Sequence, residues 1–567
     1  MPIQKHWVRL KHDREAVDRL SCDLKIQPLT AALLISRGFS SAEEAFQFLN
    51  PSIEQMHDPY RLTGMRQAVA RLMKAREHGE KVLVWGDYDV DGTTGTVLLR
   101  RVFRELGIPS EYHIPNRFTE GYGINIPALE SAKARGCTLG ISVDCGIRSF
   151  EPMEWAAANG FDFIITDHHL SDPAGIPKAV AVVNPNQADC KYPDKDLAGV
   201  GVALKLAHAL LAEFGRTEMI PSLMEIAAMG TIADIMRLKG ENRVIVSLGL
   251  REILNTKNQG LRALMEITDC TSEMTANHIG FRIAPRINAA GRMDVASHVV
   301  ELFESEDFNE ARRIARVLDS RNRERQQMQQ RITEQAIDEY ERTTERNVIV
   351  VAGEGWHRGV IGLAASKLAE KFYRPTIVLS AENGVAYGSA RSIPEYNIVE
   401  ALVSCSGIFD QFGGHSMAAG MQLPTENIGK LRTELNRHAL NSLSSQQLLP
   451  KLTIDAPVSS GTLGLEIVQE LSRLEPFGAG NPRPVFVTKG LRLRSEPFVM
   501  KQKHLRLNLI DADNRRLEAV WWDGVERSEG QTLTEGVGIE VAYTLEANSW
   551  QGNTRLQLVV SDLRADN

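Results

Sequence analysis

A chain of 567 residues is too long for one hydrophobic core, and ordinary domain sizes predict about three to four domains. Hydrophobic residues make up 43% of the chain and charged residues 24%, and no segment approaches the roughly 18 apolar residues of a membrane span, so the composition excludes a helical membrane protein. The net charge of -7 argues mildly against a nucleic-acid partner, although a sum over the whole chain does not report on a local basic groove.

The first 50 residues are expected to form an N-terminal segment ahead of the first domain. Its opening stretch, MPIQKHWVRLKHDRE, lacks the apolar core of a secretion signal, and we therefore expect a cytoplasmic protein with no membrane partner. The sequence has no CxxC pair, so neither zinc-ribbon nor thiol-redox spacing is present.

Three predicted strands between residues 81 and 170 each end in a polar cluster. KVLVWG leads into DYDVDG and then into a helical segment that ends at Gly107, CTLGISV leads into DCG, and FDFIIT leads into DHHL. Strands that alternate with helices predict a parallel sheet with right-handed crossovers, whose carboxyl ends share one edge. Open α/β sheets place their sites at that edge, so we expect the three clusters to meet there.

The rest of the chain divides by pattern into three further parts. A charged segment with an interrupted apolar stripe predicts a long linking helix, and NVIVVAGEGWHRGVIGLAASKL then gives strand, glycine-rich loop and helix again. Alternating segments such as HLRLNLI and GIEVAYTL, broken by polar turns, predict a small antiparallel barrel or sandwich. We therefore expect two α/β domains with parallel-type sheets and a C-terminal all-β barrel. The expected boundaries are an N-terminal segment at 1–50, the first α/β domain at 51–304, the linking helix at 305–346, the second α/β domain at 347–450 and the barrel at 451–567.

The loop after the first predicted strand carries three alternating acids, Asp87, Asp89 and Asp91. At least two of their carboxylates can point into one small volume, which favours a metal site. A solvated acidic turn or a helix N-cap cluster would have the same pattern, since Asp is common at helix starts. A calcium loop of the EF-hand type does not fit, because no Glu stands at its twelfth position.

The other two strand ends and a later apolar segment supply further candidate ligands. Asp144 follows the second strand, Asp167, His168 and His169 follow the third, and Asp234 interrupts the apolar segment AAMGTIADIM. Each alone has an ordinary interpretation as a helix cap or a surface residue. Acidic or imidazole groups at three successive strand ends favour a shared site, and this ligand chemistry suits manganese or magnesium better than zinc. Such a set can hold two ions roughly 3.5 to 4 Å apart, as in enzymes that displace phosphoryl oxygens.

The order DYDVDG, VDCG, DHH and GTIAD resembles the four motifs of the DHH phosphoesterase family, in sequence and with comparable spacing. The resemblance implies that two Mn²⁺ or Mg²⁺ ions are bound and that phosphodiester bonds are hydrolysed. It implies that Asp87 contributes to the metal site in a supporting role and that Asp167 and His169 act in catalysis. The implied metal ligands are Asp89, Asp91, Asp144, His168 and Asp234.

Motifs outside these four resemble the RecJ branch of that family over nearly the whole chain. They are PNRFTEGYG at 115–123, RINAAGR at 286–292, GWHRGVIGLAASKL at 355–368, GSARS at 388–392 and FGGHSMAAG at 412–420. This branch implies a single-stranded-DNA-specific exonuclease of recombination and repair that releases 5'-mononucleotides in the 5'-to-3' direction. It also implies cooperation with a helicase and with single-stranded-DNA-binding protein.

The same resemblance assigns residues to the DNA. Arg117, Ser389 and Arg391 would grip the 5'-terminal phosphate, Tyr122 would stack near the first bases, and His415 from the second domain would complete the catalytic cleft. The positions expected to contact the backbone beside the metals are Arg286, Asn288 and Arg292. In the barrel, which resembles an oligonucleotide-binding fold, the candidate base platforms are Phe486, Trp521, Trp522 and Trp550, although such aromatics are more often core.

Two other functions share part of this pattern. A DHH phosphodiesterase of short oligoribonucleotides or cyclic dinucleotides would have the same four motifs, but those relatives are commonly shorter and lack the barrel. An inactive DHH replication scaffold would have lost ligands, whereas every ligand position is filled here. The sequence therefore favours the exonuclease.

Overall fold

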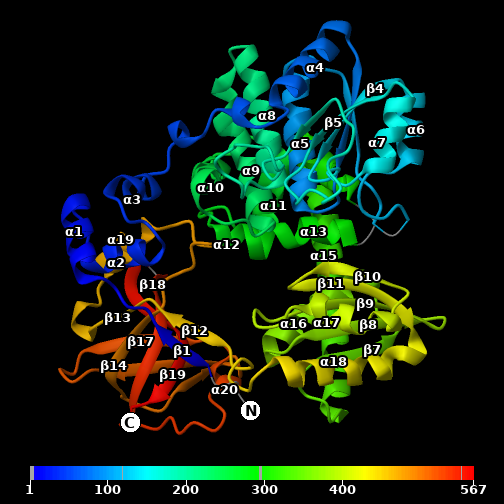
Figure 1. Cartoon of the computed structure of the whole chain (residues 1–567). Coiled ribbons are helices and arrows are strands. Elements are labelled where there is room, and N and C mark those ends of the chain that lie inside the picture. Colours follow the sequence, from blue (N-terminus) through cyan, green and yellow to red (C-terminus); the bar gives the residue numbers. More distant parts are fainter. Residues whose placement is uncertain (1–4, 118, 293–295, 551, 567) are drawn as a thin grey trace. The chain divides into compact units, whose positions relative to one another are not determined.

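The computed structural model describes residues 5–117, 119–292, 296–550 and 552–566 (Figure 1). The chain forms two compact units. Unit A comprises residues 43–323 and 473–482, and unit B comprises residues 1–42, 324–472 and 483–567. Among the helices described, none has the length and apolar character needed to cross a membrane.

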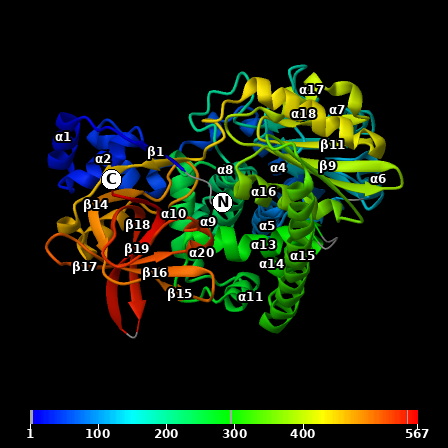
Figure 2. The ribbon, with the colours of Figure 1, turned by 90° about the horizontal axis from the view of Figure 1, so that it is seen from below.

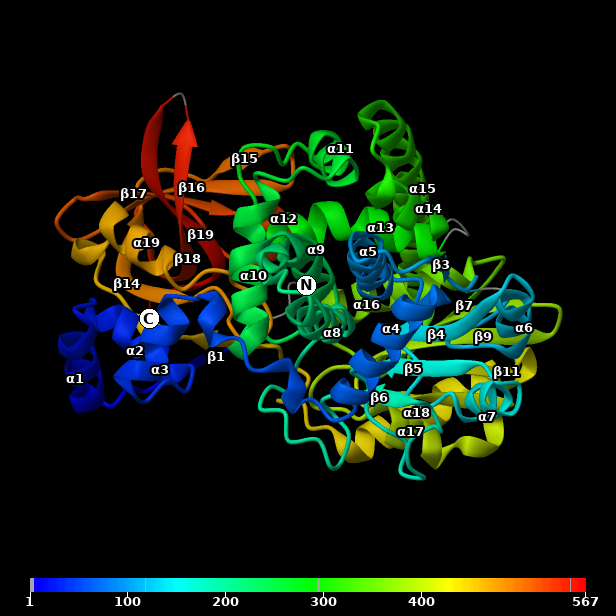
Figure 3. The same ribbon diagram turned by 90° about the horizontal axis from the view of Figure 1, so that it is seen from above.

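Unit A is built on a five-stranded sheet in the order β3-β2-β4-β5-β6, in which every neighbouring pair is parallel. Figure 3 shows β4, β5 and β6 side by side. The predicted strand–helix alternation produces this sheet because a parallel pair needs a crossover connection. The strands are β2 (Lys81–Gly86), β3 (Ser110–His113), β4 (Cys137–Val143), β5 (Asp162–Thr166) and β6 (Ala181–Val183).

Residues that alternate along β2 face opposite sides of this sheet. Val82 and Val84 belong to a large core with helices α4, α5 and α8, whereas Leu83 and Trp85 pack with α6 and α7. Both faces are therefore buried, which explains why these strands are near-continuous apolar runs. The helices around the sheet are α4 (Met65–His78), α5 (Val90–Glu105), α6 (Ile126–Ala134), α7 (Phe150–Ala158) and α8 (Gly199–Glu213).

A helical layer extends the core on the α5 and α8 side, where α9 packs on both helices and on α10. One of its elements, η4, is a π-helical turn. The elements are α9 (Ile220–Ala233), α10 (Gly240–Ile253), α11 (Gln259–Thr268), α12 (Ala276–His278), η4 (Ile279–Ile283), α13 (Ala284–Arg292) and α14 (Ser297–Glu304). Helix α3 (Ala42–Leu49) contacts α10, where the guanidinium of Arg243 donates to the Phe48 carbonyl and lies over its ring. The predicted linking segment is a single helix, α15 (Phe308–Arg342).

Unit B contains the second α/β domain, whose sheet has the order β10-β11-β9-β8-β7. The prediction of a parallel-type sheet holds for one pair only: β7 and β8 are parallel, and the other three pairs are antiparallel. The reason is connectivity, because one helix (α16) joins β7 to β8, whereas β8, β9 and then β10, β11 are joined by tight turns. Figure 2 shows β9 and β11 with α17 and α18 on one side and α16 on the other. The elements are β7 (Ile349–Glu354), α16 (Arg358–Phe372), β8 (Thr376–Glu382), β9 (Val385–Arg391), α17 (Ile398–Ser404), β10 (Gln411–His415), β11 (Ala418–Pro424) and α18 (Ile428–Ser442).

The C-terminal part of unit B is a closed barrel, as predicted. Strand β14 pairs with both β18 and β16, so the strands β14, β18, β19, β17 and β16 form a ring. Five strands in a partly open barrel are typical of the oligonucleotide-binding fold. The strands and helices are β12 (Lys451–Ile454), β13 (Ala456–Pro457), α19 (Leu465–Ser472), β14 (Phe486–Leu493), β15 (Phe498–Met500), β16 (His504–Ile510), β17 (Arg516–Trp521), α20 (Gly524–Arg527), β18 (Gly538–Trp550) and β19 (Asn553–Ala565).

The barrel interior corrects two of the predicted base platforms. Phe486 is fully buried and Trp521 is 1% exposed, and both belong to the core because inward positions of a small barrel must be filled by large side chains. Trp522, the next residue on the outward face, is 51% exposed. The side chain of Trp550 lies outside the described part of the chain.

The N-terminal residues 5–42 also belong to unit B. Strand β1 (His6–Arg9) pairs in parallel with β12, and Trp7 packs in a small core with Val487 of the barrel. Two helices follow, α1 (Arg14–Leu24) and α2 (Pro28–Ser36).

Candidate metal centre

The polar clusters predicted at the strand ends of unit A meet at one edge of the sheet. Asp87 directly follows β2, Asp144 follows β4, and Asp167 begins the loop after β5. Asp234 joins them as the C-cap of α9. Asp89 is the N-cap of α5, where its carboxylate accepts a hydrogen bond from the backbone of Gly92. Parallel strands and one helix end therefore bring together residues up to 147 positions apart in the sequence, from Asp87 to Asp234.

His168 lies at the centre of this cluster. Its Nε2 atom is 3.1 Å from Oδ1 of Asp144 and 3.6 Å from Oδ2 of Asp234, and Oδ2 of Asp91 is 3.9 Å away. Within the described residues, three groups have ligand atoms within 4.8 Å of one another. The groups are Asp144, His168 and His169; Asp91, His168 and Asp234; and Asp87, Asp89 and Asp144.

The first helical turn of α8 fixes the Asp91 carboxylate. The backbone N–H of Gly199 donates to Oδ2 at 2.7 Å, and that of Val200 donates to Oδ1 at 2.8 Å. Both donors are unpaired backbone groups of a helix N-terminus, which favours a nearby negative charge. The sequence analysis missed this contact, whose only signal was the glycine-rich start of the helical run GVGVALKLAHALL.

Four carboxyl groups of the cluster destabilise one another when no cation is present. Burial and the charge of Asp89 raise the pKa of Asp87 to about 8, and the same two causes raise the pKa of Asp234 to about 7. Burial and neighbouring aspartates also raise the pKa values of Asp91 and Asp144 well above the ordinary value. A bound cation would offset this repulsion and favour the ionised forms.

Two buried carboxylate oxygen atoms of the cluster show that its residues fit a metal ion. Within the described chain, Oδ1 of Asp87 and Oδ1 of Asp144 accept no hydrogen bond, although His168 Nε2 approaches the latter to 3.1 Å. Buried polar atoms normally have partners, and ligand atoms that converge without a hydrogen between them suit a shared cation. Carboxylate oxygens with one imidazole are the donors that Mn²⁺ and Mg²⁺ accept, so the residues fit these ions.

The two histidines of the cluster differ in charge. Burial and the neighbouring His169 lower the pKa of His168 to about 4, so its ring is neutral and its Nε2 is free to bind a metal. Burial also disfavours the charged form of His169, but the hydrogen bond and charge of Asp167 outweigh it and raise the pKa of His169 to about 9. His168 is therefore suited to be a ligand, and His169 to contact a phosphate as a cation.

Two asparagines that the sequence analysis missed hold the loop of the two histidines. Asn184 donates to the carbonyl of His169 at 2.9 Å, and Asn186 donates to that of His168 at 2.6 Å. Their signal was the turn-forming NPN directly after the apolar segment AVAVV.

The residues of unit A that were predicted to contact DNA do not all lie in the same surroundings. Arg117 lies over the Tyr88 ring at 5.1 Å, and the Tyr122 ring is 6.3 Å from that of His169, so both border the cluster. Asn288 accepts a hydrogen bond from the backbone of Val90 and so supports the acidic loop. Arg292 ends α13.

Arg286 is held by a different partner. It forms an ion pair with Asp319 of α15 at 2.9 Å and donates to the Arg282 carbonyl. In this arrangement its guanidinium holds α13 and α15 together, and its contact with DNA stays a prediction.

The remaining predicted residues gather on the sheet of unit B. Arg391 donates to Ser389 Oγ at 3.1 Å, and Arg391 and His415 pair with the same residue of the strand between them, Ala418. A Cβ on Gly362 of α16 would lie 2.9 Å from Ser389 Oγ, so the glycine lets this helix approach the pair closely. Since these residues belong to unit B, their predicted approach to the metal cluster of unit A stays a prediction.

Family models match three parts of the chain: a DHH family N-terminal domain at 81–231, a DHHA1 domain at 345–440 and a RecJ OB domain at 454–562. The single-stranded-DNA-specific exonuclease RecJ of Bacillus subtilis is 39% identical to the chain, over 98% of the chain and 70% of that protein. The enzyme of the same name from Escherichia coli is 33% identical over 99% of both.

The chain belongs to the RecJ family. RecJ of Thermus thermophilus has been crystallised with Mn²⁺ and with Mg²⁺, and the chain matches these structures with TM-scores of 0.84 and 0.79 at 28% and 27% identity. Each match covers 99% of this chain, and they cover 80% and 79% of the Thermus chain. The predicted family is therefore confirmed, and so is the fold class, apart from the strand directions in the sheet of unit B.

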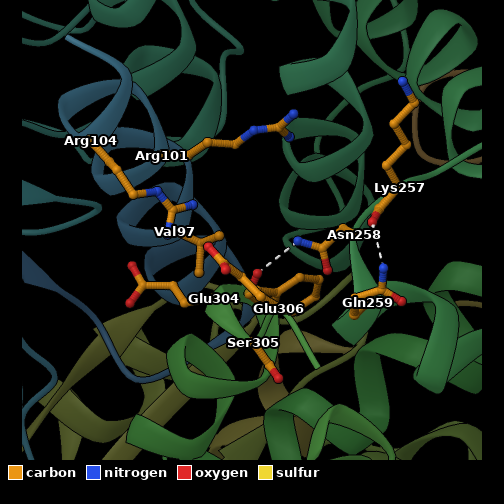
Figure 4. A pocket seen from close by; sticks show the side chains of 10 residues that line it. Val97, Arg101, Arg104, Lys257, Asn258, Gln259, Glu304, Ser305 and Glu306 are labelled. Atoms are coloured by element: carbon orange, nitrogen blue, oxygen red, sulfur yellow. Dashed lines mark hydrogen bonds between the residues drawn. The ribbon is translucent and has the colours of Figure 1, made fainter. Parts of the chain in front are cut away.

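A cavity of about 270 Å³ lies elsewhere in unit A of this RecJ-family chain, along the C-terminal half of α5 (Figure 4). Of the residues that line it, Arg101 donates to Glu225 and Ser222, and Glu304 forms an ion pair with Arg100. Of the predicted site residues, none lines this cavity. It is separate from the metal centre, which lies at the N-terminal end of the same helix.

Proposed function

We propose that this chain is a single-stranded-DNA-specific exonuclease of recombination and repair, which hydrolyses phosphodiester bonds from the 5' end and releases 5'-mononucleotides with two Mn²⁺ or Mg²⁺ ions. The observation that carries the proposal is the convergence of Asp144, Asp234 and Asp91 on His168 Nε2, with a buried Asp144 oxygen that accepts no hydrogen bond among the described residues. The names of its relatives support the choice of substrate.

The residues of the cluster have two roles in this proposal, metal binding and contact with the phosphate. The groups that would hold the ions are Asp87, Asp89, Asp91, Asp144, His168 and Asp234. When bound, such ions lower the pKa of a water ligand and neutralise charge on the phosphoryl oxygens. His169, kept cationic by Asp167, donates a hydrogen bond to a phosphate oxygen, and its charge favours the transition state. Asp167 also accepts hydrogen bonds from the backbone of His168, His169 and Ile147, which fixes the loop.

Polarity depends on a second set of residues. We assign the 5'-phosphate to Arg117, Ser389 and Arg391, the first bases to Tyr122, and completion of the cleft to His415. The Ser389 hydroxyl and Arg391 guanidinium are already 3.1 Å apart, and a charged fork beside a hydroxyl suits a terminal phosphate. Cytoplasmic location and cooperation with single-stranded-DNA-binding protein and a helicase belong to the same proposal.

The test uses the purified full chain with 5'- and 3'-labelled oligonucleotides in Mn²⁺, Mg²⁺ or EDTA. We expect mononucleotide release from the 5' label only, on single-stranded DNA, with no cleavage in EDTA. Release that begins at the 3' end would overturn the polarity, and a preference for short oligoribonucleotides or cyclic dinucleotides would identify the other DHH phosphodiesterase activity. Absence of any cleavage would support the inactive scaffold.

The sharpest variant is Asp144→Asn. Asp144 has φ 62°, a left-handed conformation that Asn tolerates and Ala does not, so Asn removes the charge without strain in the backbone. We expect activity to fall by about 1,000-fold or more, because a metal ligand is lost, while the protein folds. Near-normal digestion by this variant would contradict the assignment of the centre.

A further inference from the structure

The residue that follows the metal-centre aspartate of α9 has an unusual backbone. Ile235 adopts φ 57°, and its N–H and that of Met236 close the helix end on the carbonyls of Ile232 and Thr231. This position of a helix end normally holds glycine, because a Cβ strains the left-handed conformation and a β-branched side chain strains it further. Of the described non-glycine residues with positive φ, Ile235 is the only β-branched one.

Burial does not explain the isoleucine either. Its side chain is 75% exposed, although isoleucine is among the residue types most often found inside proteins. Glycine would adopt the left-handed conformation of the helix end with less strain, and a polar side chain would be better solvated at the surface. An outlier that neither local conformation nor packing favours is typical of a functional position.

The site next to Ile235 is the metal centre. Ile235 directly follows Asp234, whose Oδ2 is 3.6 Å from His168 Nε2. Adjacent Cα atoms are about 3.8 Å apart, so the Cα atom that carries the Ile235 side chain is this close to the Cα atom of Asp234, a proposed ligand of that centre.

A second exposed apolar side chain stands on irregular backbone beside the same helix end. Phe281 is 79% exposed on the π-helical turn η4, and π-helical turns occur frequently at functional sites. The turn packs on α9, since a Cβ on Gly280 would lie 3.7 Å from Cγ2 of Ile232, the residue whose carbonyl caps Ile235.

We propose that Ile235, together with Phe281 of the π-helical turn that packs on α9, forms an apolar platform for a nucleobase of the DNA strand held at the metal centre. This inference rests on the proposed function, because it requires a single strand at that centre. A flat base offers an apolar face whatever its identity, so an aliphatic and an aromatic side chain grip it without sequence preference. The platform fixes the strand while the charged cluster acts on its phosphate, which makes Ile235 a positioning residue for the substrate.

Ile235→Gly separates this role from a structural one. Relief of the strained conformation should raise Tm by roughly 2 °C, whereas loss of the apolar contact should raise Kd for a short 3'-labelled single strand in EDTA, and KM in Mn²⁺, roughly five- to tenfold. We expect kcat to change little, since no metal-binding group is altered. Asp269→Gly is the matched control, because Asp269 ends α11 with φ 54° and is exposed. It should stabilise the chain or leave Tm unchanged, and leave Kd and KM unchanged.

A substrate with abasic sites at its 5'-terminal nucleotides completes the test. Wild type should bind it more weakly than normal DNA, and Ile235→Gly should bind the two alike. If Ile235→Gly binds and digests normal DNA like wild type, or loses affinity equally for the abasic strand, the base platform is wrong. Failure of wild type to digest single-stranded DNA at all would instead contradict the proposed function.

Discussion

Nδ1 of His169 lies 2.8 Å from Oδ1 of Asp167, and this contact sets the charge of the histidine next to His168, the proposed metal ligand. Burial alone would make His169 neutral, but the Asp167 carboxylate raises its pKa to about 9. Burial also acts on Asp167, yet the hydrogen bonds from His169 and the backbone of Ile147 hold the pKa of Asp167 below its ordinary value. The pair is therefore an ion pair at neutral pH.

Asp167→Asn should convert His169 to its neutral form. With the carboxylate gone and burial remaining, the pKa of His169 should fall from about 9 to its ordinary value or lower, and activity at neutral pH should fall roughly 10- to 100-fold. The titration is followed by NMR of the histidine ring in the metal-free protein. Asp172→Asn, on the same loop, is the control and should not move it. An unchanged His169 titration in Asp167→Asn would contradict this account.

The carboxylate cluster links metal binding to pH. Since the folded-state pKa values of Asp87 and Asp234 are raised to about 8 and about 7, the metal-free folded chain holds protons that the unfolded chain has lost. Its stability should therefore fall as pH rises from about 4 to about 8. Mn²⁺ binds the ionised carboxylates and releases these protons, so its affinity should rise over the same range.

The linkage is measured as the Tm shift caused by Mn²⁺ and, by calorimetry in buffers of different ionisation enthalpy, as proton release. We expect Mn²⁺ to raise Tm more at about pH 8 than at about pH 6. We also expect Mn²⁺ binding to release protons at about pH 6. Asp144→Asn should reduce the Tm shift and should stabilise the metal-free chain, because folding then no longer buries a carboxyl whose ionised form is disfavoured. A Tm shift independent of pH would argue that the cluster is ionised without metal.

Close packing at the start of α8 makes Gly199 necessary for the centre. A Cβ on Gly199 would lie 2.6 Å from Cβ and 2.8 Å from Oδ1 of Asp144, so Gly199→Ala must displace this carboxylate. We expect Mn²⁺ affinity to fall roughly 10- to 100-fold, as measured by calorimetry. Gly201→Ala is the matched control in the same helical turn, since its Cβ would make an ordinary 3.4 Å contact with Leu197. Equal Mn²⁺ affinity in both variants would show that the loop of Asp144 accommodates the added methyl group.

The cluster at the strand ends could be predicted from the sequence because most of its parts are local. The runs KVLVWG, CTLGISV and FDFIIT are apolar on both faces, which requires a covered parallel sheet, and a parallel sheet collects its strand ends at one edge. Asp234 was harder to place, since the end of a helix is not an edge of a sheet. Its place in the apolar segment AAMGTIADIM made it a candidate that family resemblance then assigned, and the structure brings its Oδ2 atom to 3.6 Å from Nε2 of His168.

What the sequence could not predict depends on partners distant in the chain. The ion pair of Arg286 with Asp319 of another helix could not be seen in the sequence, and the expected contact of Arg286 with DNA stays a prediction. Phe486 and Trp521 were expected as possible base platforms, but the barrel closes around them, whereas the neighbouring Trp522 faces outward. The left-handed conformation of Ile235 could not be predicted either, because isoleucine rarely adopts that conformation.

A buried ion pair in unit A provides the clearest stability prediction. Lys205 Nζ lies 2.8 Å from Oε1 of Glu241, and both side chains are fully buried. Glu241 also accepts a hydrogen bond from the Tyr192 hydroxyl, and Lys205 donates to the His57 carbonyl. Glu241→Gln should leave an unpaired buried ammonium and reduce the free energy of unfolding by about 3–5 kcal/mol.

The pH dependence of that loss identifies its cause. Burial lowers the pKa of Lys205, and the charge of Glu241 opposes this, so removal of the charge should lower the pKa further. A lysine whose folded-state pKa lies below the unfolded value loses its proton on folding, and the stability of Glu241→Gln should rise with pH until the lysine is neutral in both states. Urea denaturation at several pH values measures this. Glu310→Gln, which breaks the exposed pair with Arg313, is the control and should have no measurable effect. A deficit in Glu241→Gln that stays constant with pH would assign the loss to packing and hydrogen bonds instead of the unpaired charge.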